Sequence, residues 1–318
     1  MKACAFAPGK IIICGEHFVV YGATALAAAI NKGTTAKAEP SPKTTIYSKD
    51  FGIQADLSTS SIPERLKPLA AAITAVKEHL GEKRGVKLTI QSDLPPRSGL
   101  GSSSSSAVAA VAASARALGH TLPLDDIIKL AMSAEHLVHK NPSGIDVHVS
   151  ARGGVLLFTK GTPPEPIQLK KKVRFVIAST GVERETGELV ERVRMWREQN
   201  PSLFNSLVES ASILSRCCAE ALILGDLKRA GAILNFFHST LSWLGISIKE
   251  IEQIVEVALS CPAALGAKLT GAGGGGSVII LCSEDGVEDV VKSVSKVASE
   301  TFITPLPNNG VKTWIEKS

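Results

Sequence analysis

The stretch PPRSGLGSSSSSAVAA, residues 95–110, places five consecutive serines directly after Gly-Leu-Gly. By composition alone, such a run of glycine and serine is typical of a flexible linker. Its position favours another role, because a strand-like segment precedes it and an apolar helix follows it. Small residues and serines let successive backbone N–H groups and a helix N-terminus point at one anion. The stretch therefore predicts a phosphate-binding loop.

Two common phosphate-binding motifs do not fit this loop. It lacks the lysine of the Walker A motif and the third glycine of the dinucleotide-binding fingerprint. A second stretch, GAGGGG at residues 271–276, does match G-x-G-x-x-G. However, a strand-like segment at 277–281 follows it, where a dinucleotide site needs a helix. Glycines between two strands instead favour close approach to a ligand or to a neighbouring segment.

Four ionisable residues are of types that can take part in acid–base or charge-stabilising chemistry. Lys10 and His17 lie seven positions apart, and Glu135 and Asp146 lie eleven positions apart. A carboxylate can take the proton of a hydroxyl, and a lysine can stabilise the developing charge. Taken singly, each residue also has a structural interpretation. Asp146 could cap a helix, Lys10 could be a solvated surface lysine, and Glu135 and His17 could be polar residues at element ends.

Hydrophobic periodicity predicts a mixed α+β chain. Strands are predicted at residues 3–7, 11–14, 34–39, 44–48, 53–57, 86–90, 153–158 and 173–179, in a glycine-rich hairpin over 265–282, and in a strand pair around 308–310. Helices are predicted at 66–80, 107–118, 124–139, 188–198, 202–224, 226–241, 248–259 and 287–299. The helix at 107–118 is expected to begin where the serines end. A turn at 161–164 marks the boundary between two domains, residues 1–165 and 166–318.

Net charge, aromatic content and hydropathy indicate which partners the protein is expected to lack. The 318-residue chain has a net charge of +5 and only 4% aromatic residues, which does not favour a nucleic-acid-binding protein. The basic run at residues 170–174 leads into an apolar strand and is interpreted as its solvated start. No signal peptide and no stretch long enough to span a membrane are recognised, so a cytoplasmic protein without a membrane partner is predicted. The six cysteines show no C-x-x-C spacing.

Three segments together resemble the three motifs of the GHMP small-molecule kinases. They are PGKIIICGEHFVVYG at 8–22, PPRSGLGSS at 95–103 and KLTGAGGGG at 268–276, and the resemblance covers essentially the whole chain. GEHFVVYG and the E…NPSGID segment at 135–146 are most similar to those of the mevalonate kinases. The resemblance implies a two-domain α+β GHMP kinase fold, with an N-terminal domain like domain 2 of ribosomal protein S5. It also implies a ferredoxin-like C-terminal domain and a site in the cleft between the two.

The family chemistry implied is ATP- and Mg²⁺-dependent phosphorylation of mevalonate to 5-phosphomevalonate, in isoprenoid biosynthesis. By matched position, Asp146 is the catalytic base and Lys10 the charge-stabilising lysine, and Ser103 and Glu135 hold Mg²⁺. The matched phosphate-binding residues are Pro96, Arg97, Ser98, Gly99, Leu100, Gly101, Ser102, Ser103, Ser104 and Ser105. The matched acceptor-binding residues are Glu16, His17, Thr186, Gly271, Ala272 and Gly273. A homodimer is the family expectation.

The chain departs from the family pattern mainly on the acceptor side. Phe18 stands where the family commonly has a small residue, and GVERET at 181–186 lacks the lysine and proline of Lys-x-Pro-Arg-x-Thr. Ser104 and Ser105 replace alanines that are usual in the loop. The nearest alternatives are a phosphomevalonate kinase or a mevalonate kinase of other regiochemistry. A non-catalytic nucleotide sensor or RNA-binding module is disfavoured by the joint presence of lysine, serine, glutamate and aspartate at the catalytic positions.

Overall fold

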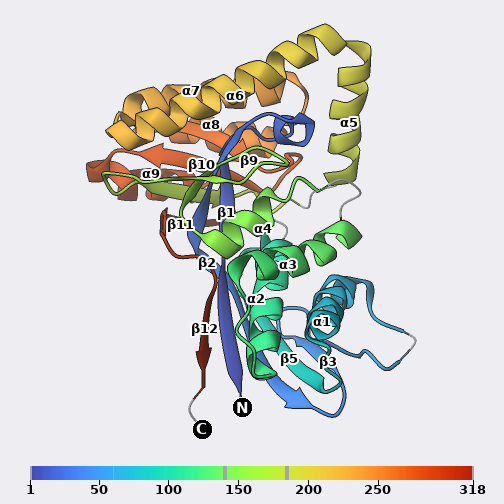
Figure 1. Cartoon of the computed structure of the whole chain (residues 1–318). Coiled ribbons are helices and arrows are strands. Elements are labelled where there is room, and N and C mark those ends of the chain that lie inside the picture. Colours follow the sequence, from blue (N-terminus) through green and yellow to red (C-terminus); the bar gives the residue numbers. More distant parts are fainter. Residues whose placement is uncertain (1, 60, 97, 139–141, 183–185, 317–318) are drawn as a thin grey trace.

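The computed structural model describes residues 2–59, 61–96, 98–138, 142–182 and 186–316. The larger of its sheets has the strand order β12-β1-β2-β5-β3-β4, and β6 pairs with β2 and with β7 (Figure 1). Within the described ranges, β3 and β5 are the only strands that pair in parallel. The strands are β1 (Ala3–Cys14), β2 (Ala25–Ser41), β3 (Thr45–Ser48), β4 (Ile53–Asp56), β5 (Gly85–Ser92), β6 (Val155–Phe158), β7 (Glu165–Ile167) and β12 (Lys312–Ile315).

Helix α2 (Ser102–Ala117) is the central helix of this part of the molecule. It packs on β1, β2 and β5, and α1 (Lys67–Leu80), α3 (Leu124–Val138) and α4 (Ile145–Arg152) pack around it. Alanines and valines occupy most of α2 and are almost entirely buried. Such small side chains allow the helix to approach the sheet and its neighbours closely. The N-terminus of α2 is thereby fixed beside β1, as Figure 1 shows.

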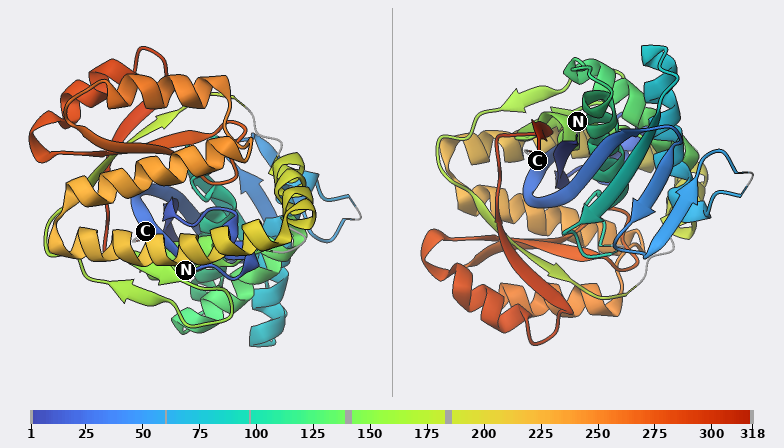
Figure 2. Two further views of the ribbon diagram at one scale, coloured as in Figure 1. Left: turned by 90° about the horizontal axis from the view of Figure 1, so that it is seen from above. Right: turned by 90° about the horizontal axis from the view of Figure 1, so that it is seen from below.

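The smaller sheet is antiparallel, with the strand order β11-β8-β10-β9. Its strands are β8 (Arg174–Ser179), β9 (Ala264–Thr270), β10 (Ser277–Cys282) and β11 (Glu300–Pro305). Helices α7 (Leu227–Trp243) and α8 (Lys249–Leu259) pack on β9, and α9 (Val287–Val294) packs on β8 and β11. Helix α5 (Thr186–Gln199) leads into α6 (Pro201–Leu224), and α6 and α7 run side by side in Figure 2.

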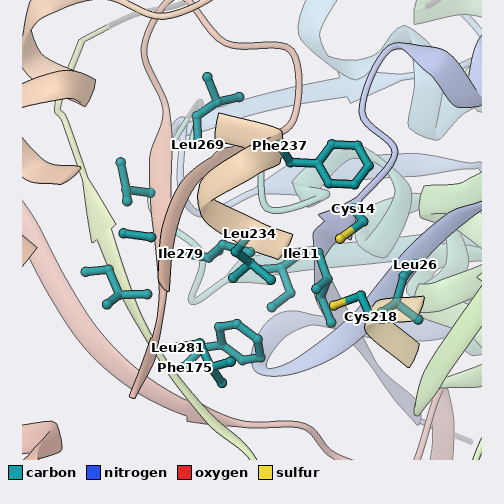
Figure 3. Packing of buried hydrophobic residues seen from close by; sticks show 14 of the residues in the cluster. Ile11, Cys14, Leu26, Phe175, Cys218, Leu234, Phe237, Leu269, Ile279 and Leu281 are labelled. Atoms are coloured by element: carbon teal, nitrogen blue, oxygen red, sulfur yellow. The ribbon is translucent and has the colours of Figure 1, made fainter. Parts of the chain in front are cut away.

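One buried apolar cluster joins the two sheets. In Figure 3, Ile11 and Cys14 of β1 and Leu26 of β2 lie on one side of α7, which carries Leu234 and Phe237, and Leu269 of β9 lies on the other side. Helix α6 also lies against β1 and β2, so it contributes to the same cluster. Burial of this apolar surface stabilises a fixed arrangement of the two halves. The motif residues of β1 are therefore positioned directly against those of β9.

The α+β class and most elements agree with the sequence predictions. However, β2 begins at Ala25 and not at residue 34, and helix α4 was not predicted. Four further predictions were wrong. The helix after the serine run begins at Ser102, not at residue 107, because buried serines find hydrogen-bond partners inside the fold. The strands at 3–7 and 11–14 are one strand, β1, with an irregularity near Pro8. Helix α9 ends at Val294, before residue 299.

The fourth wrong prediction is the terminal strand pair. β11 and β12 do not pair with each other, since β11 pairs with β8 and β12 crosses back to pair with β1. A domain division at residue 165 stays a prediction, and β7 and β12 both lie in the larger sheet. Across the described residues, no helix is both long and apolar enough to cross a membrane.

Candidate active site

The five serines, residues 102–106, form the first turns of α2 and differ in how far they are buried. Gly101 occupies the N-cap position with φ 77°, and a Cβ there would lie 2.9 Å from Cγ of Lys10. The Ser105 hydroxyl lies 2.8 Å from the Thr34 hydroxyl of β2 and donates to the Ser102 carbonyl. Ser102 and Ser103 are more exposed. The run is therefore the start of a helix, whose first N–H groups have no partner within the helix, and the linker interpretation is wrong.

Lys10 and Asp146 meet beside this helix start. The Nζ of Lys10 lies 3.1 Å from Oδ2 of Asp146 and donates to the Gly99 carbonyl at 3.1 Å. The backbone N–H of Lys10 donates to the Leu100 carbonyl at 2.8 Å, which attaches β1 to the loop. Lys10 is 3% exposed, whereas the Asp146 side chain is 29% exposed. A buried lysine thus holds a carboxylate that a ligand can reach.

The structure does not support a capping role for Asp146. Helix α4 has Gly144 at its N-cap position, with no side-chain cap, and Asp146 lies within the first turn. Lys10 is likewise no solvated surface lysine. These are two of the structural interpretations that the sequence leaves open, and neither fits the observed contacts.

Glu135, on α3, contacts the serine run of α2. It is 5% exposed, and its Oε1 accepts a hydrogen bond from the Ser104 hydroxyl at 2.5 Å. Ser103, the serine predicted to share a metal ion with Glu135, is exposed. Nearby, the Ser98 hydroxyl is buried and has no hydrogen-bond partner among the described residues. Carboxylate and hydroxyl oxygens gathered at an open helix start are the kind of ligands that Mg²⁺ prefers.

The turn after β1 contacts the glycine-rich segment after β9. Nε2 of His17 lies 3.0 Å from the Ala272 carbonyl oxygen. Glu16 is buried and forms an ion pair with Lys268 of β9. Burial raises the pKa of Glu16, while the positive charge of Lys268 acts in the opposite direction. Its carboxylate thus lies against Lys268, and contact with an acceptor stays a prediction.

The remaining predicted positions are distributed as follows. Pro96 is exposed, Leu100 is buried, and Gly271 and Gly273 lie in the segment between β9 and β10. Arg97 lies outside the described residues, as does the side chain of Thr186. Phe18 packs into the core against Phe204 of α6, with ring centroids 5.8 Å apart.

Sequence reasoning gave Lys268 no role and gave Ser104 a different one, phosphate binding. Lys268 is the first residue of the third motif, KLTGAGGGG, but the resemblance assigns it no role. A lysine inside the apolar run of β9 is nevertheless a signal of a buried ion pair. Ser104 is one of the matched phosphate-binding positions and replaces an alanine that is usual there. Its hydroxyl contact with Glu135 joins residues distant in the sequence, so spacing alone gave no signal.

Comparisons with known proteins agree with this geometry. The family model described as "GHMP kinases N terminal domain" matches residues 67–154, and "GHMP kinases C terminal" matches residues 218–300. The mevalonate kinase of Aeropyrum pernix is 35% identical over 318 residues, covering 98% of each chain. The mevalonate kinase of Thermococcus gammatolerans is 36% identical over 334 residues, again covering 98% of each chain.

Solved structures show the same relationship. The Methanococcus jannaschii mevalonate kinase superposes with a TM-score of 0.83 at 26% identity, covering 96% of this chain and 98% of that one. The L. major mevalonate kinase in complex with R-mevalonate gives a TM-score of 0.80 at 28% identity, covering 95% and 94%. These matches confirm the two-domain GHMP kinase fold predicted from the motifs. The chain belongs to the mevalonate kinase family within the GHMP kinases.

Proposed function

We propose that the protein transfers the γ-phosphoryl group of ATP to the primary hydroxyl of mevalonate, giving 5-phosphomevalonate and ADP. The observation that carries this proposal is the Lys10–Asp146 pair at the N-terminus of α2, with Nζ and Oδ2 3.1 Å apart. Relatives more than 30% identical over nearly their whole length carry the name mevalonate kinase, which supports mevalonate as the acceptor. The ATP-binding side follows from the helix start and its open N–H groups.

The mechanism begins with proton transfer. The carboxylate of Asp146 takes the proton of the acceptor hydroxyl, and the freed oxygen forms the new bond to the γ-phosphorus. The bond from that phosphorus to the bridging oxygen breaks, and ADP leaves with the electron pair. Lys10 stabilises the negative charge that develops during transfer, while the N-terminus of α2 orients the phosphates. His17 contacts the acceptor from the turn after β1.

Glu135 and the serine run would hold the Mg²⁺ ion that accompanies ATP. A bound Mg²⁺ supplies neutralisation of phosphate charge. The Ser104 hydroxyl donates a hydrogen bond to Oε1 of Glu135 and thereby orients the carboxylate. Ser103 is exposed beside it, so its hydroxyl is available. The two serines are thus assigned different tasks: Ser103 as a ligand and Ser104 as the residue that orients Glu135.

Alanine substitutions separate these tasks. Ser104→Ala removes a hydrogen bond to a buried carboxylate and is expected to lower the unfolding free energy by about 1.5–3 kcal/mol. Ser103→Ala removes an exposed hydroxyl and is expected to leave stability unchanged, while raising the Mg²⁺ concentration needed for half-maximal rate. Urea unfolding and Mg²⁺ titration of both variants measure the two effects. An unchanged metal dependence in Ser103→Ala would show that Ser103 is not a ligand.

A coupled ADP-release assay with several acceptors tests the proposed function. Mevalonate, phosphomevalonate, homoserine and galactose are compared at equal concentrations, and turnover with mevalonate alone is expected. Turnover only with one of the other three would contradict the assignment. The Streptococcus pneumoniae phosphomevalonate kinase is 19% identical to this chain, so that likeness concerns the fold alone. A homodimeric assembly and a cytoplasmic location belong to the same proposal.

A further inference from the structure

The backbone at His17 is strained. Its φ is 59° and its ψ is −47°, and no other non-glycine residue in the described part of the chain has a positive φ. The N–H of Phe18 donates to the Glu16 carbonyl at 2.6 Å, which closes a three-residue γ-turn around His17. A γ-turn with positive φ at its central residue is rare and strained. Such a conformation persists only where the surrounding contacts hold it.

Lys268 contacts Glu16, the residue that begins this turn. This lysine is 0% exposed on β9, and Glu16, its ion-pair partner, is 1% exposed. The Nζ of Lys268 also donates to the Leu269 carbonyl at 2.6 Å and lies 3.4 Å from the Ile12 carbonyl oxygen. A buried charge is very unfavourable without a partner, so breaking this pair is strongly opposed. The side chain that precedes His17 is thereby fixed to the other sheet.

Two further contacts link the same segments. The Ile12 N–H donates to the Thr270 hydroxyl at 2.9 Å, and that hydroxyl lies 3.2 Å from the Ile12 carbonyl oxygen. Beyond β9, the Ala272 carbonyl oxygen lies 3.0 Å from Nε2 of His17. β9 therefore contacts β1 at Ile12 and the turn at Glu16. The segment after β9 contacts the ring of His17, at the centre of the turn.

We propose that Lys268 is a positioning residue. By holding Glu16 through the buried ion pair, it keeps His17 in the strained turn and fixes the His17 ring beside Ala272. Glu16 then serves as an anchor within the protein, not as a contact to the acceptor. This inference rests on the proposed function, in which His17 contacts the acceptor, and it assigns no contact with substrate to Lys268.

The competing explanation is an ion pair that only joins the two sheets. A matched control exists, because Lys32 of β2 forms an ion pair with Glu300 of β11 at 2.8 Å. That pair also joins the two sheets, but it is exposed and lies away from the turn. If joining the sheets were the whole role of Lys268, Lys268→Met and Lys32→Met would both leave the acceptor KM unchanged.

The test uses the full-length protein with three variants in addition to Lys32→Met. Lys268→Met leaves Glu16 buried without a partner, so this variant is at risk of not folding. The double variant Glu16→Gln/Lys268→Met removes both charges at similar volume and is expected to fold. Glu16→Gln alone keeps an oxygen that accepts a hydrogen bond from Nζ. The measurements are KM for mevalonate, KM for ATP, and the ring ¹H–¹⁵N signals of His17, assigned with His17→Gln.

We expect the double variant to raise the KM for mevalonate about 10-fold or more and to shift the His17 ring signals. Its KM for ATP should change by less than about twofold. Lys32→Met should leave the KM for mevalonate within about threefold of the wild-type value. Glu16→Gln leaves the buried Lys268 ammonium with a neutral partner, so it should raise the KM for mevalonate in the same direction as the double variant. A folded double variant with wild-type KM for mevalonate and unshifted His17 signals would overturn the inference. Lack of turnover of mevalonate by the wild-type protein would instead refute the proposed function. The His17 ring signals would still test the role of Lys268 in that case, because they are measured without turnover.

Discussion

Replacing Asp146 with asparagine is expected to lower the turnover number about 10²–10⁴-fold, the usual effect of losing a positioned base. This corresponds to about 3–5 kcal/mol of transition-state stabilisation. Asparagine keeps the shape of the side chain and an oxygen that can accept the hydrogen bond from Lys10. The N-cap of α4 is Gly144, so the helix does not depend on the carboxylate. ATP affinity is expected to change little, because the N-terminus of α2 supplies it.

Turnover and ATP binding are measured on the same folded preparation. Asp126→Asn is the control, since Asp126 lies on α3 with its nearest ion-pair partner, His79, 3.8 Å away. An Asp146→Asn protein that binds ATP normally and retains the wild-type rate would end the assignment of Asp146 as the base. Equal losses in both variants would indicate a general effect of removing acidic residues.

The second large effect is expected for Lys10→Met. Removing a charge aimed at the developing negative charge typically lowers the rate about 10²–10³-fold. The Lys10 ammonium is buried and is already held by Asp146 and the Gly99 carbonyl. Because it is fixed there before substrates bind, we expect its loss to lower the turnover number more than it changes KM. Methionine has nearly the same length and fits an apolar environment, so the packing around Gly101 is retained.

The comparison variant is Lys43→Met, which removes a highly exposed lysine with a 3.8 Å ion pair to Asp56. Steady-state kinetics with ATP and mevalonate, each varied separately, resolve the effect on turnover from the effects on KM. If the folded Lys10→Met protein turns over within about threefold of the wild-type rate, Lys10 does not stabilise the transition state.

Long periodic segments were predicted well from the sequence. Helices α6 (Pro201–Leu224) and α7 (Leu227–Trp243) begin and end within a few residues of the predicted limits. Their apolar residues recur at helical spacing, and proline, aspartate and glycine mark their ends. The glycine-rich hairpin of β9 and β10 was also predicted, because alternating or continuous apolar runs flank the glycines.

The serine run shows why local preference alone was insufficient. Serine disfavours helix interiors because its hydroxyl competes for backbone groups. Here the Ser105 and Ser104 hydroxyls are bound by Thr34 and Glu135, which lie on other elements. These contacts exist only in the folded chain. The pairing of β12 with β1 is similarly non-local, since it joins the two ends of the described chain.

The candidate site was predicted unevenly for the same reason. Lys10 and Asp146 were singled out through the family motifs, and the structure brings them within 3.1 Å. Residue types and spacing alone left both with structural interpretations as well. Lys268 had no assigned role, because only the fold shows that it is buried against Glu16. Motifs thus singled out the residues that we propose to face the ligands, whereas the residues that hold them in place required the structure.

The most direct test of the central claim is to identify the product made from ATP and mevalonate. The reaction is followed to completion, and the phosphorus-coupled NMR signals of the product show which carbon bears the new phosphate. We expect phosphorus coupling to the C5 methylene protons, together with ADP formed in equal amount to the product. Phosphate on the tertiary oxygen at C3, or ADP formed without any phosphorylated mevalonate, would contradict transfer to the primary hydroxyl.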